Sequence, residues 1–304
     1  MTRRLELKTL LIGDNSFIGV SHLSQDRARA RTEQLNTTRM ASIVERAAEC
    51  GASGFTFSTH PTNLEILRAL HDSDKISVPF DLYPVLPYAQ GYVRLANEKG
   101  MRGLFEEVLS RMPLSDKAAA IFKGGLSALK LDFTGLMQAY IDMELGTYLK
   151  VKPRTANLRS VLLHEVATDL CLGLGSVNLL EAFANHVREG HHVRPGFITY
   201  NLSRFVELLR DSELNMEDID IMTPFNSIGY QMSPSRSACE ACLSPLPKSN
   251  VIAMSIMAGG YLNLDQAYEY LNTLPKLSGI AVGVSSEEHA TQTFEKLRKL
   301  LSPM

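Results

Sequence analysis

Short apolar runs alternate with longer segments of helical periodicity along most of the chain. Each run is rich in β-branched or other apolar residues and is followed by polar and glycine residues, then by a helix-like segment. This alternation is typical of βα units and predicts a parallel sheet. The predicted strands cover residues 9–13, 54–58, 76–83, 160–164, 196–201, 219–226, 251–258 and 280–284.

The segments between these strands have recognisable helix boundaries. One helix is predicted to start after Asn36 and to end at Gly51, and another to run from Ser176 to Gly190, because Asn and Ser cap helix starts and Gly ends helices. No GxGxxG motif opens the first helix, as it would in an open dinucleotide-binding sheet. We therefore predict a single (β/α)8 barrel over residues 1–304.

The connection between the third and fourth predicted strands is much longer than the others. Within residues 93–158, the segments LFEEVLSRM, AAAIFKGGLSALKL and FTGLMQAYIDMELGTYL have apolar residues at helical spacing. We predict a helical insertion, which could cover the active site, pack outside the barrel or build a contact in a homo-oligomer. Tyr83, Tyr88 and Tyr92 at its entry could line a pocket or pack as ordinary core residues.

Composition and charge narrow the class of protein. A chain that is 45% hydrophobic and 21% charged, with no long apolar run, is typical of a soluble globular protein without a membrane span. A net charge of −2 without a basic stripe argues against a nucleic-acid or membrane-surface partner. The first residues lack the apolar core of a signal peptide, so we expect a cytoplasmic protein that acts on a small molecule.

The four cysteines do not form a recognisable framework. They are too few and too scattered for a disulfide scaffold in a chain of this length. Cys239 and Cys242 have CxxC spacing, but no second pair or histidine pair accompanies them. We predict that they are packed helix cysteines.

Polar residues gather where the predicted strands end, which is where catalytic groups lie in such barrels. His60, Asp81, His164 and Glu165 are the main candidates. His164 directly follows the apolar run VLL, and an imidazole can accept or donate a proton near neutral pH; the alternative is a histidine bonded to the backbone. Other polar residues at or beyond strand ends are Asp14, Asn15, Ser16, His22, Ser58, Thr59, Tyr200 and Asn226.

The same four candidates could instead hold a divalent metal, since each offers a lone pair. We favour acid/base chemistry because no HExxH-type motif is present. Lysine is absent from the predicted strand ends, which argues against a Schiff-base aldolase, and no GxSxG motif indicates a serine hydrolase.

Small residues follow the last two predicted strands. Gly259 and Gly260 follow the seventh, and Gly283, Ser285 and Ser286 end or follow the eighth. Loops at these positions often bind phosphate in barrels, because glycine lets backbone N–H groups approach an anion. The alternative is that the turns themselves require glycine.

Several segments resemble the aldo-keto reductase superfamily. CGASGFTFSTHPTNLEILRAL is similar to the second strand, with Thr59 and Glu65 in matching places, and VLLHE to the fourth, whose catalytic histidine falls on His164. ITYNLSRFVELL and VIAMSIMAGGYL are similar to the fifth and seventh, with Asn201 and Ser255 in register, and IAVGVSSEEHATQTFEKL to the eighth and its cofactor-binding helix. The resemblance implies NAD(P)H binding, with Asn201 at the nicotinamide amide.

The resemblance fails at three of the family's four catalytic positions. The family reduces carbonyls with an Asp, Tyr, Lys and His around the substrate oxygen. Here Ser58 stands in the place of the Asp, no Tyr follows it, and the third predicted strand offers Asp81 rather than Lys. Glu287 and Glu288 would also repel the adenosine phosphate of NADPH.

Three hypotheses follow. The first is a lyase, isomerase or dehydratase acting on a small oxygenated substrate, with His164 as base and Asp81 or His60 as its partner. The second is an NAD(P)H-dependent oxidoreductase with an altered proton donor. The third is a non-catalytic binding protein, because loss of three of the four catalytic residues is also what disuse leaves. Fold alone does not decide among the three hypotheses.

Overall fold

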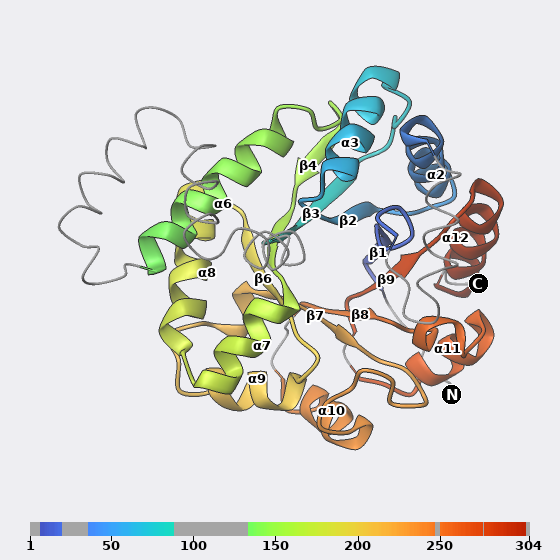
Figure 1. The fold of residues 1–304 in the computed structure, drawn as a ribbon. Coiled ribbons are helices and arrows are strands. Elements are labelled where there is room, and N and C mark those ends of the chain that lie inside the picture. Colours follow the sequence, from blue (N-terminus) through green and yellow to red (C-terminus); the bar gives the residue numbers. More distant parts are fainter. Residues whose placement is uncertain (1–6, 20–35, 88–132, 247–249, 276, 302–304) are drawn as a thin grey trace, which may run out of the picture.

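A computed structural model describes residues 7–19, 36–87, 133–246, 250–275 and 277–301. Parallel strands form a closed ring in the centre, and helices surround it (Figure 1). The order around the ring is β2-β1-β9-β8-β7-β6-β5-β3, and pairing of β2 with β3 closes it. The predicted barrel is confirmed.

The barrel has eight strands in the described part of the chain, because β4 and β5 are two parts of one strand. β4 pairs with the start of β3 and β5 with its end, and the N–H of Arg159 between them still donates to Leu82 O. The strands are β1 (Thr9–Gly13), β2 (Gly54–Ser58), β3 (Phe80–Leu86), β4 (Ala156–Leu158), β5 (Ser160–Leu163), β6 (Arg194–Ile198), β7 (Asp220–Pro224), β8 (Asn250–Met254) and β9 (Gly279–Gly283).

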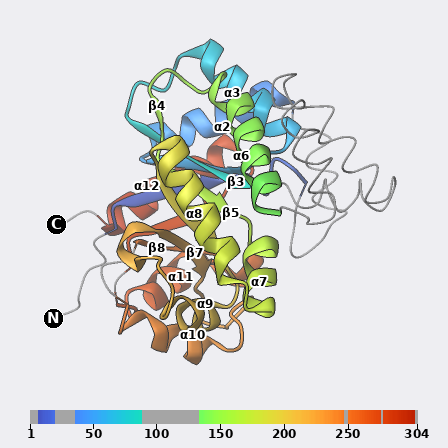
Figure 2. The same cartoon turned by 90° about the vertical axis from the view of Figure 1, so that its left-hand side faces the viewer.

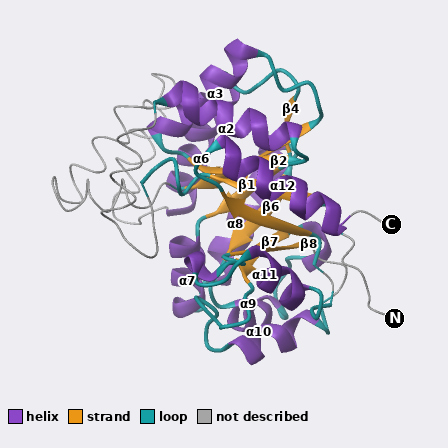
Figure 3. Cartoon of the chain, turned by 90° about the vertical axis from the view of Figure 1, so that its right-hand side faces the viewer, coloured by secondary structure: helices purple, strands orange, loops and turns teal. Residues whose placement is uncertain are grey.

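Helices cover the outside of the sheet (Figure 3). Both predicted helix starts are confirmed: the Asn36 side chain accepts from Arg39 N, and Ser176 directly precedes α8. No described helix is both long and apolar enough to cross a membrane. The helices are α2 (Thr37–Glu49), α3 (Pro61–Ser73), α6 (Phe133–Leu149), α7 (Glu165–Leu174), α8 (Val177–His191), α9 (Leu202–Leu209), α10 (Arg236–Leu243), α11 (Leu264–Leu271) and α12 (Glu287–Leu301), with short 3-10 turns η1 (Met216–Asp218) and η2 (Ala258–Gly260).

Alternation along the strands makes two cores. Leu11 points into the barrel, whereas Leu10 and Ile12 on either side of it pack against the helices. Most of the apolar core lies in the outer layer between sheet and helices. The inner core is smaller, and its buried members are Leu11, Tyr83, Val85, Leu162, Ile198, Met222 and Ile252.

The third strand is shifted from its predicted position. It begins at Phe80 rather than Ile76 and runs to Leu86, since Pro79 interrupts the earlier residues and the strand pairs with β2 from Asp81 to Val85. Asp81 is therefore its second residue, opposite Gly54 at the start of β2. The prediction that Asp81 ends this strand is wrong.

Four other strands end earlier than predicted. The predicted fourth strand stops one residue earlier, at Leu163, because His164 begins the turn into α7. The predicted fifth, sixth and seventh strands stop at Ile198, Pro224 and Met254, so their polar ends lie in the loops that follow. These loops carry the residues that matter for the site.

The predicted insertion, residues 93–158, is described only from residue 133 onward. α6 packs against α8 outside the barrel (Figures 1 and 2). Tyr83 is buried in the inner core, so ordinary packing accounts for it. His22, Tyr88, Tyr92 and the first two predicted helical segments of the insertion lie outside the described residues.

The cysteines behave as packed residues. Cys239 is buried and Cys242 half-buried on α10, and the described cysteines are all free. Burial raises the pKa of the Cys239 thiol to about 11, which makes it a poor nucleophile at neutral pH. The prediction of packed helix cysteines is confirmed.

Candidate active site

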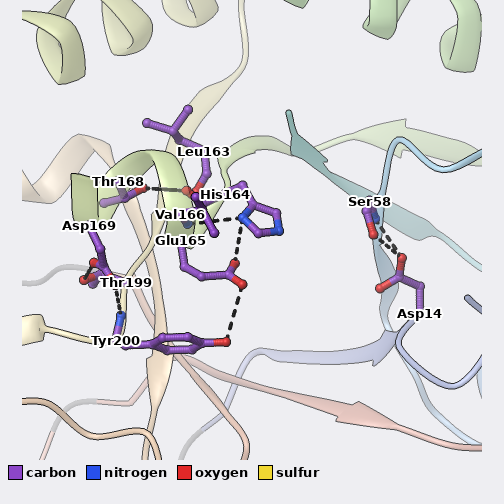
Figure 4. Close-up of polar contacts among 10 residues, drawn as sticks. All are labelled: Asp14, Ser58, Leu163, His164, Glu165, Val166, Thr168, Asp169, Thr199 and Tyr200. Atoms are coloured by element: carbon purple, nitrogen blue, oxygen red, sulfur yellow. Dashed lines mark hydrogen bonds and ion pairs between the residues drawn. The ribbon is translucent and has the colours of Figure 1, made fainter. Parts of the chain in front are cut away.

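Polar side chains from four strand ends gather at one end of the barrel, which we call the mouth: Asp14, Ser58, His164, Glu165 and Tyr200. Ser58 is the last residue of β2, and the others follow β1, β5 and β6. Because the strands are parallel, these carboxyl ends share one edge of the barrel. Figure 4 shows His164, Glu165 and Tyr200 on one side, with Asp14 and Ser58 across from them.

His164 joins β5 to α7 and caps that helix. Its N–H donates to Leu86 O at 2.6 Å, which holds it at the end of β3. Its Nδ1 lies 3.2 Å from Val166 N and 3.2 Å from Glu165 Oε2. Nδ1 can accept from the Val166 N–H or, when it carries a proton, donate to the Glu165 carboxylate, but it cannot do both.

This choice determines what Nε2 offers to a substrate. When Nδ1 accepts from Val166, the proton of a neutral imidazole sits on Nε2, which is then a donor. When Nδ1 donates to Glu165, Nε2 carries a lone pair and can act as a base. The hydrogen bond between Val166 N and His164 Nδ1 is exposed, so water can replace the imidazole as the acceptor of the Val166 N–H.

Tyr200 extends this group on the other side of Glu165. Its hydroxyl donates to Glu165 Oε1 at 3.4 Å (Figure 4). Burial, and then the negative charge of Glu165, raise the pKa of Tyr200 well above its usual range. The phenol therefore stays protonated and holds the carboxylate in place.

A second carboxylate fixes the loop that carries Tyr200. Asp169 on α7 accepts from Thr199 Oγ1 at 2.5 Å and from Tyr200 N at 3.1 Å. Burial raises the pKa of Asp169, and the two hydrogen bonds oppose that rise. α7 thus supplies both residues, Glu165 and Asp169, that orient Tyr200.

Asp14 is the most buried acid of the mouth; the sequence placed it at a strand end but not among the main candidates. Its Oδ2 accepts from Ser58 N at 2.8 Å, Ser58 Oγ at 2.6 Å and Asn63 Nδ2 at 2.7 Å. Burial raises the pKa of Asp14 despite these three hydrogen bonds. Its carboxylate thus contacts Ser58, the residue at which the resemblance expects an Asp. The run Ile12-Gly13-Asp14 at a strand end was the available signal.

His60 lies at the end of β2 but is tied to the backbone. Its Nδ1 accepts from Thr62 N at 3.1 Å and so caps α3, and its carbonyl accepts from the Tyr148 hydroxyl at 2.8 Å. The neighbouring Thr59 hydroxyl is buried and has no hydrogen-bond partner in the described part of the chain. A polar group without a partner at a strand end is a place where a ligand could bind.

Asp81 does not belong to this group. His164 is level with Leu86, because its N–H donates to Leu86 O, and Asp81 lies five residues before Leu86 on β3. At roughly 3.3 Å per residue, Asp81 is therefore about 16 Å from the level of His164 along the strand. His60, Asp81, His164 and Glu165 therefore cannot surround one metal ion. The metal alternative for these four residues is wrong.

Two of the expected cofactor residues are already engaged. Asn201 Oδ1 accepts from Arg204 N and Ser203 Oγ, both at 3.1 Å, and caps α9. The Ser255 hydroxyl donates to Gln231 Oε1 at 3.0 Å. Each keeps one further group for a ligand: the amide of Asn201 and the lone pairs of the Ser255 hydroxyl.

The glycine loops separate into two kinds. Gly259 and Gly260 have φ values of 72° and 108°, so the turn after β8 itself requires glycine. Gly283 has no such φ, and a Cβ there would meet no atom within 4 Å in the described part of the chain beyond its own chain neighbours. Beyond it Ser286 accepts from His289 N and caps α12, whose first turn holds Glu287 and Glu288.

Comparison with known structures places the architecture in one class, the aldo-keto reductase fold. A Pseudomonas aeruginosa protein assigned as an aldo-keto reductase matches with a TM-score of 0.59 and 12% identity, over 98% of this chain and 92% of that chain. An aldo-keto reductase from Bacillus halodurans in its holo form matches with a TM-score of 0.53 and 11% identity, over 99% and 91%. No protein-family model and no curated protein sequence matches. The resemblance to aldo-keto reductases is thus confirmed for the fold.

Proposed function

We propose that the chain is an enzyme that transfers a proton to or from a small oxygenated substrate at the mouth, in a lyase, isomerase or dehydratase reaction. The observation that carries this proposal is the position of His164 Nδ1, 3.2 Å from both Val166 N and Glu165 Oε2. Moving between these partners lets Nε2 serve as donor or as base. Glu165 and Tyr200 position the imidazole.

The proton delivery of aldo-keto reductases does not suit these residues. It needs a Tyr as acid and a Lys beside it. β2 ends at Ser58, and β3 ends at Leu86 with Pro87 after it, so neither strand end supplies this pair. His164 is the one candidate that coincides with the family's catalytic residues.

Proton transfer can be tested before the substrate is known. A panel of small hydroxy- and oxo-acids, ketones and sugars is incubated with the protein in D2O, and exchange of carbon-bound protons is followed by NMR. We expect exchange in at least one compound, and its loss in His164→Asn, which keeps a helix-capping side chain but has no imidazole. Exchange that is unchanged in His164→Asn would contradict the proposal.

A second candidate is a nicotinamide-dependent oxidoreductase, and the open space at Gly283 favours it. The backbone of Gly283 and Ser285 would hold a phosphate-bearing group, and Asn201 would contact the nicotinamide. Such a cofactor supplies hydride transfer when bound. Glu287 and Glu288 favour NADH over NADPH, because they would repel the additional phosphate.

The two candidates are separated by binding. If NADH raises the Tm of the purified protein and NADPH does so less, the oxidoreductase is favoured. If neither nucleotide changes the Tm at millimolar concentration, this second candidate is excluded and the proton-transfer proposal stands.

A further inference from the structure

Three metal-ligating side chains converge outside the barrel, away from the residues of the mouth. Asp142 lies on α6, and His186 and His191 lie on α8. Asp142 Oδ1 is 2.8 Å from His186 Nε2 and 2.7 Å from His191 Nε2. The two helices run side by side on the outer face in both views (Figures 1 and 2).

Both imidazoles direct their Nε2 atoms at the same carboxylate oxygen. Each Nε2 here must donate a proton to the same Oδ1. The rings meet edge to face, with centroids 5.7 Å apart and planes at 80°, so their Nε2 atoms approach a common point from different directions. If both protons leave, two nitrogen lone pairs and a carboxylate face that point.

We propose that Asp142, His186 and His191 bind a divalent transition-metal ion, best matched by Zn²⁺. Imidazole nitrogen and carboxylate oxygen suit this ion, which binds both at about 2.0–2.2 Å. In tetrahedral geometry such bonds place ligand atoms about 3.3 Å apart. The present separations of 2.7 and 2.8 Å therefore need to open by about half an ångström.

Burial is uneven around the three ligands. The side chains of His186 and His191 are 16% and 17% exposed, whereas that of Asp142 is 54% exposed. The histidines are held by packing, and the carboxylate side is open to solvent, where water completes the coordination. The ion would join α6, the last helix of the insertion, to the helix layer of the barrel.

The test is titration of the chelator-treated, dialysed full chain with Zn²⁺ by calorimetry. We expect about one ion per chain, and a Tm that rises with Zn²⁺ concentration. With Co²⁺ as a spectroscopic probe, we expect the visible absorption of a tetrahedral site. Asp142→Asn and His191→Gln each remove one ligand. Each should raise the Kd for Zn²⁺ by at least about tenfold, because loss of even an outer-shell partner typically lowers metal affinity by about 10- to 100-fold.

The matched control is His192→Asn. His192 adjoins the site, is exposed and has a φ of 54°, which Asn tolerates. We expect it to bind Zn²⁺ as the wild type does, and likewise His164→Asn at the mouth. Failure of the wild type to bind, unchanged binding in both ligand variants, or equal loss in either control would overturn the proposal.

Discussion

Both ends of the barrel bury a carboxylate, but in the described part of the chain only one end pairs it with a cation. At the amino ends of the strands, which we call the floor (Asp81, Ser160, Arg194 and Asp220), Arg194 Nε lies 2.9 Å from Asp220 Oδ1. At the mouth, Asp14 is held by Ser58 and Asn63, which are neutral, and has no ion pair within the described residues.

Burial raises the pKa of both acids. The ionised form of each is therefore less favourable in the folded protein than in the unfolded chain. For Asp220 a hydrogen bond from Ser160 and then the charge of Arg194 oppose the rise in pKa, whereas for Asp14 only hydrogen bonds oppose it. A buried acid without a cation destabilises the folded state, and such groups are concentrated at functional sites. We therefore predict that the floor serves stability and the mouth serves function, as is general in these barrels.

The largest expected effect is on the chemistry at the mouth. His164→Ala should lower any proton-transfer rate about 10²- to 10⁴-fold, the usual contribution of an acid/base group. It also removes the cap of α7, at a cost of about 1 kcal/mol. Rates and urea unfolding of His164→Ala and His164→Asn separate the two effects, and a normal rate in either variant would remove His164 from the mechanism.

The next effect is on stability at the floor. Arg194→Met leaves Asp220 buried without its cation and should lower the free energy of unfolding by about 3 kcal/mol. The deficit should shrink as the pH falls, because protonation of Asp220 removes the unpaired charge.

Urea unfolding of the wild type and of Arg194→Met, at several pH values from neutral downward, measures how much stability the variant loses. Arg204→Met is the control: its exposed pair with Glu207 at 3.0 Å should contribute less than about 1 kcal/mol. Loss of activity per folded Arg194→Met molecule would contradict the division between floor and mouth.

Asp14→Asn tests the opposite end and should have a smaller effect of opposite sign. Asn can keep the three hydrogen bonds at one oxygen without a buried charge. The folded pKa of Asp14 is raised, so wild-type stability falls as the pH rises through that pKa, and the variant lacks this loss.

We expect Asp14→Asn to gain on the order of 1 kcal/mol at neutral pH, with no gain below the unfolded pKa. Activity should fall while stability rises. Urea unfolding at both pH values, together with rates, measures this; a variant that is less stable and fully active would assign Asp14 to the structure alone.

The barrel could be predicted from the sequence because the patterns that indicate it lie within single short segments. Apolar runs and helix caps such as Asn36 are readable one segment at a time. Strand position was less readable: Asp81 looked like a strand end because Ile76 and Val78 extend the apolar pattern backwards, and only pairing with β2 fixes where β3 begins.

Contacts between distant residues were not readable at all. Asp14 and Ser58 are 44 residues apart, and their hydrogen bond exists only because β1 and β2 are neighbours. Asp142 and His191 are 49 residues apart on separate helices, with no motif to relate them. His164 and Glu165 were found because they adjoin a single strand end.

The smallest effect is expected at Gly283, which we compare with Gly279 at the opposite end of β9. A Cβ at Gly279 would lie 2.8 Å from Thr9 O, whereas a Cβ at Gly283 would meet no described residue within 4 Å other than its chain neighbours. Gly279→Ala should therefore lower the Tm, and Gly283→Ala should change the free energy of unfolding by less than about 0.5 kcal/mol.

If a phosphate-bearing ligand is held against the backbone of Gly283, Gly283→Ala should weaken its binding several-fold at unchanged stability. Thermal unfolding of both variants, with and without NADH, measures this. An equal loss of Tm in both would show that the mouth is packed as tightly as the floor, and the contrast between the two ends would fail.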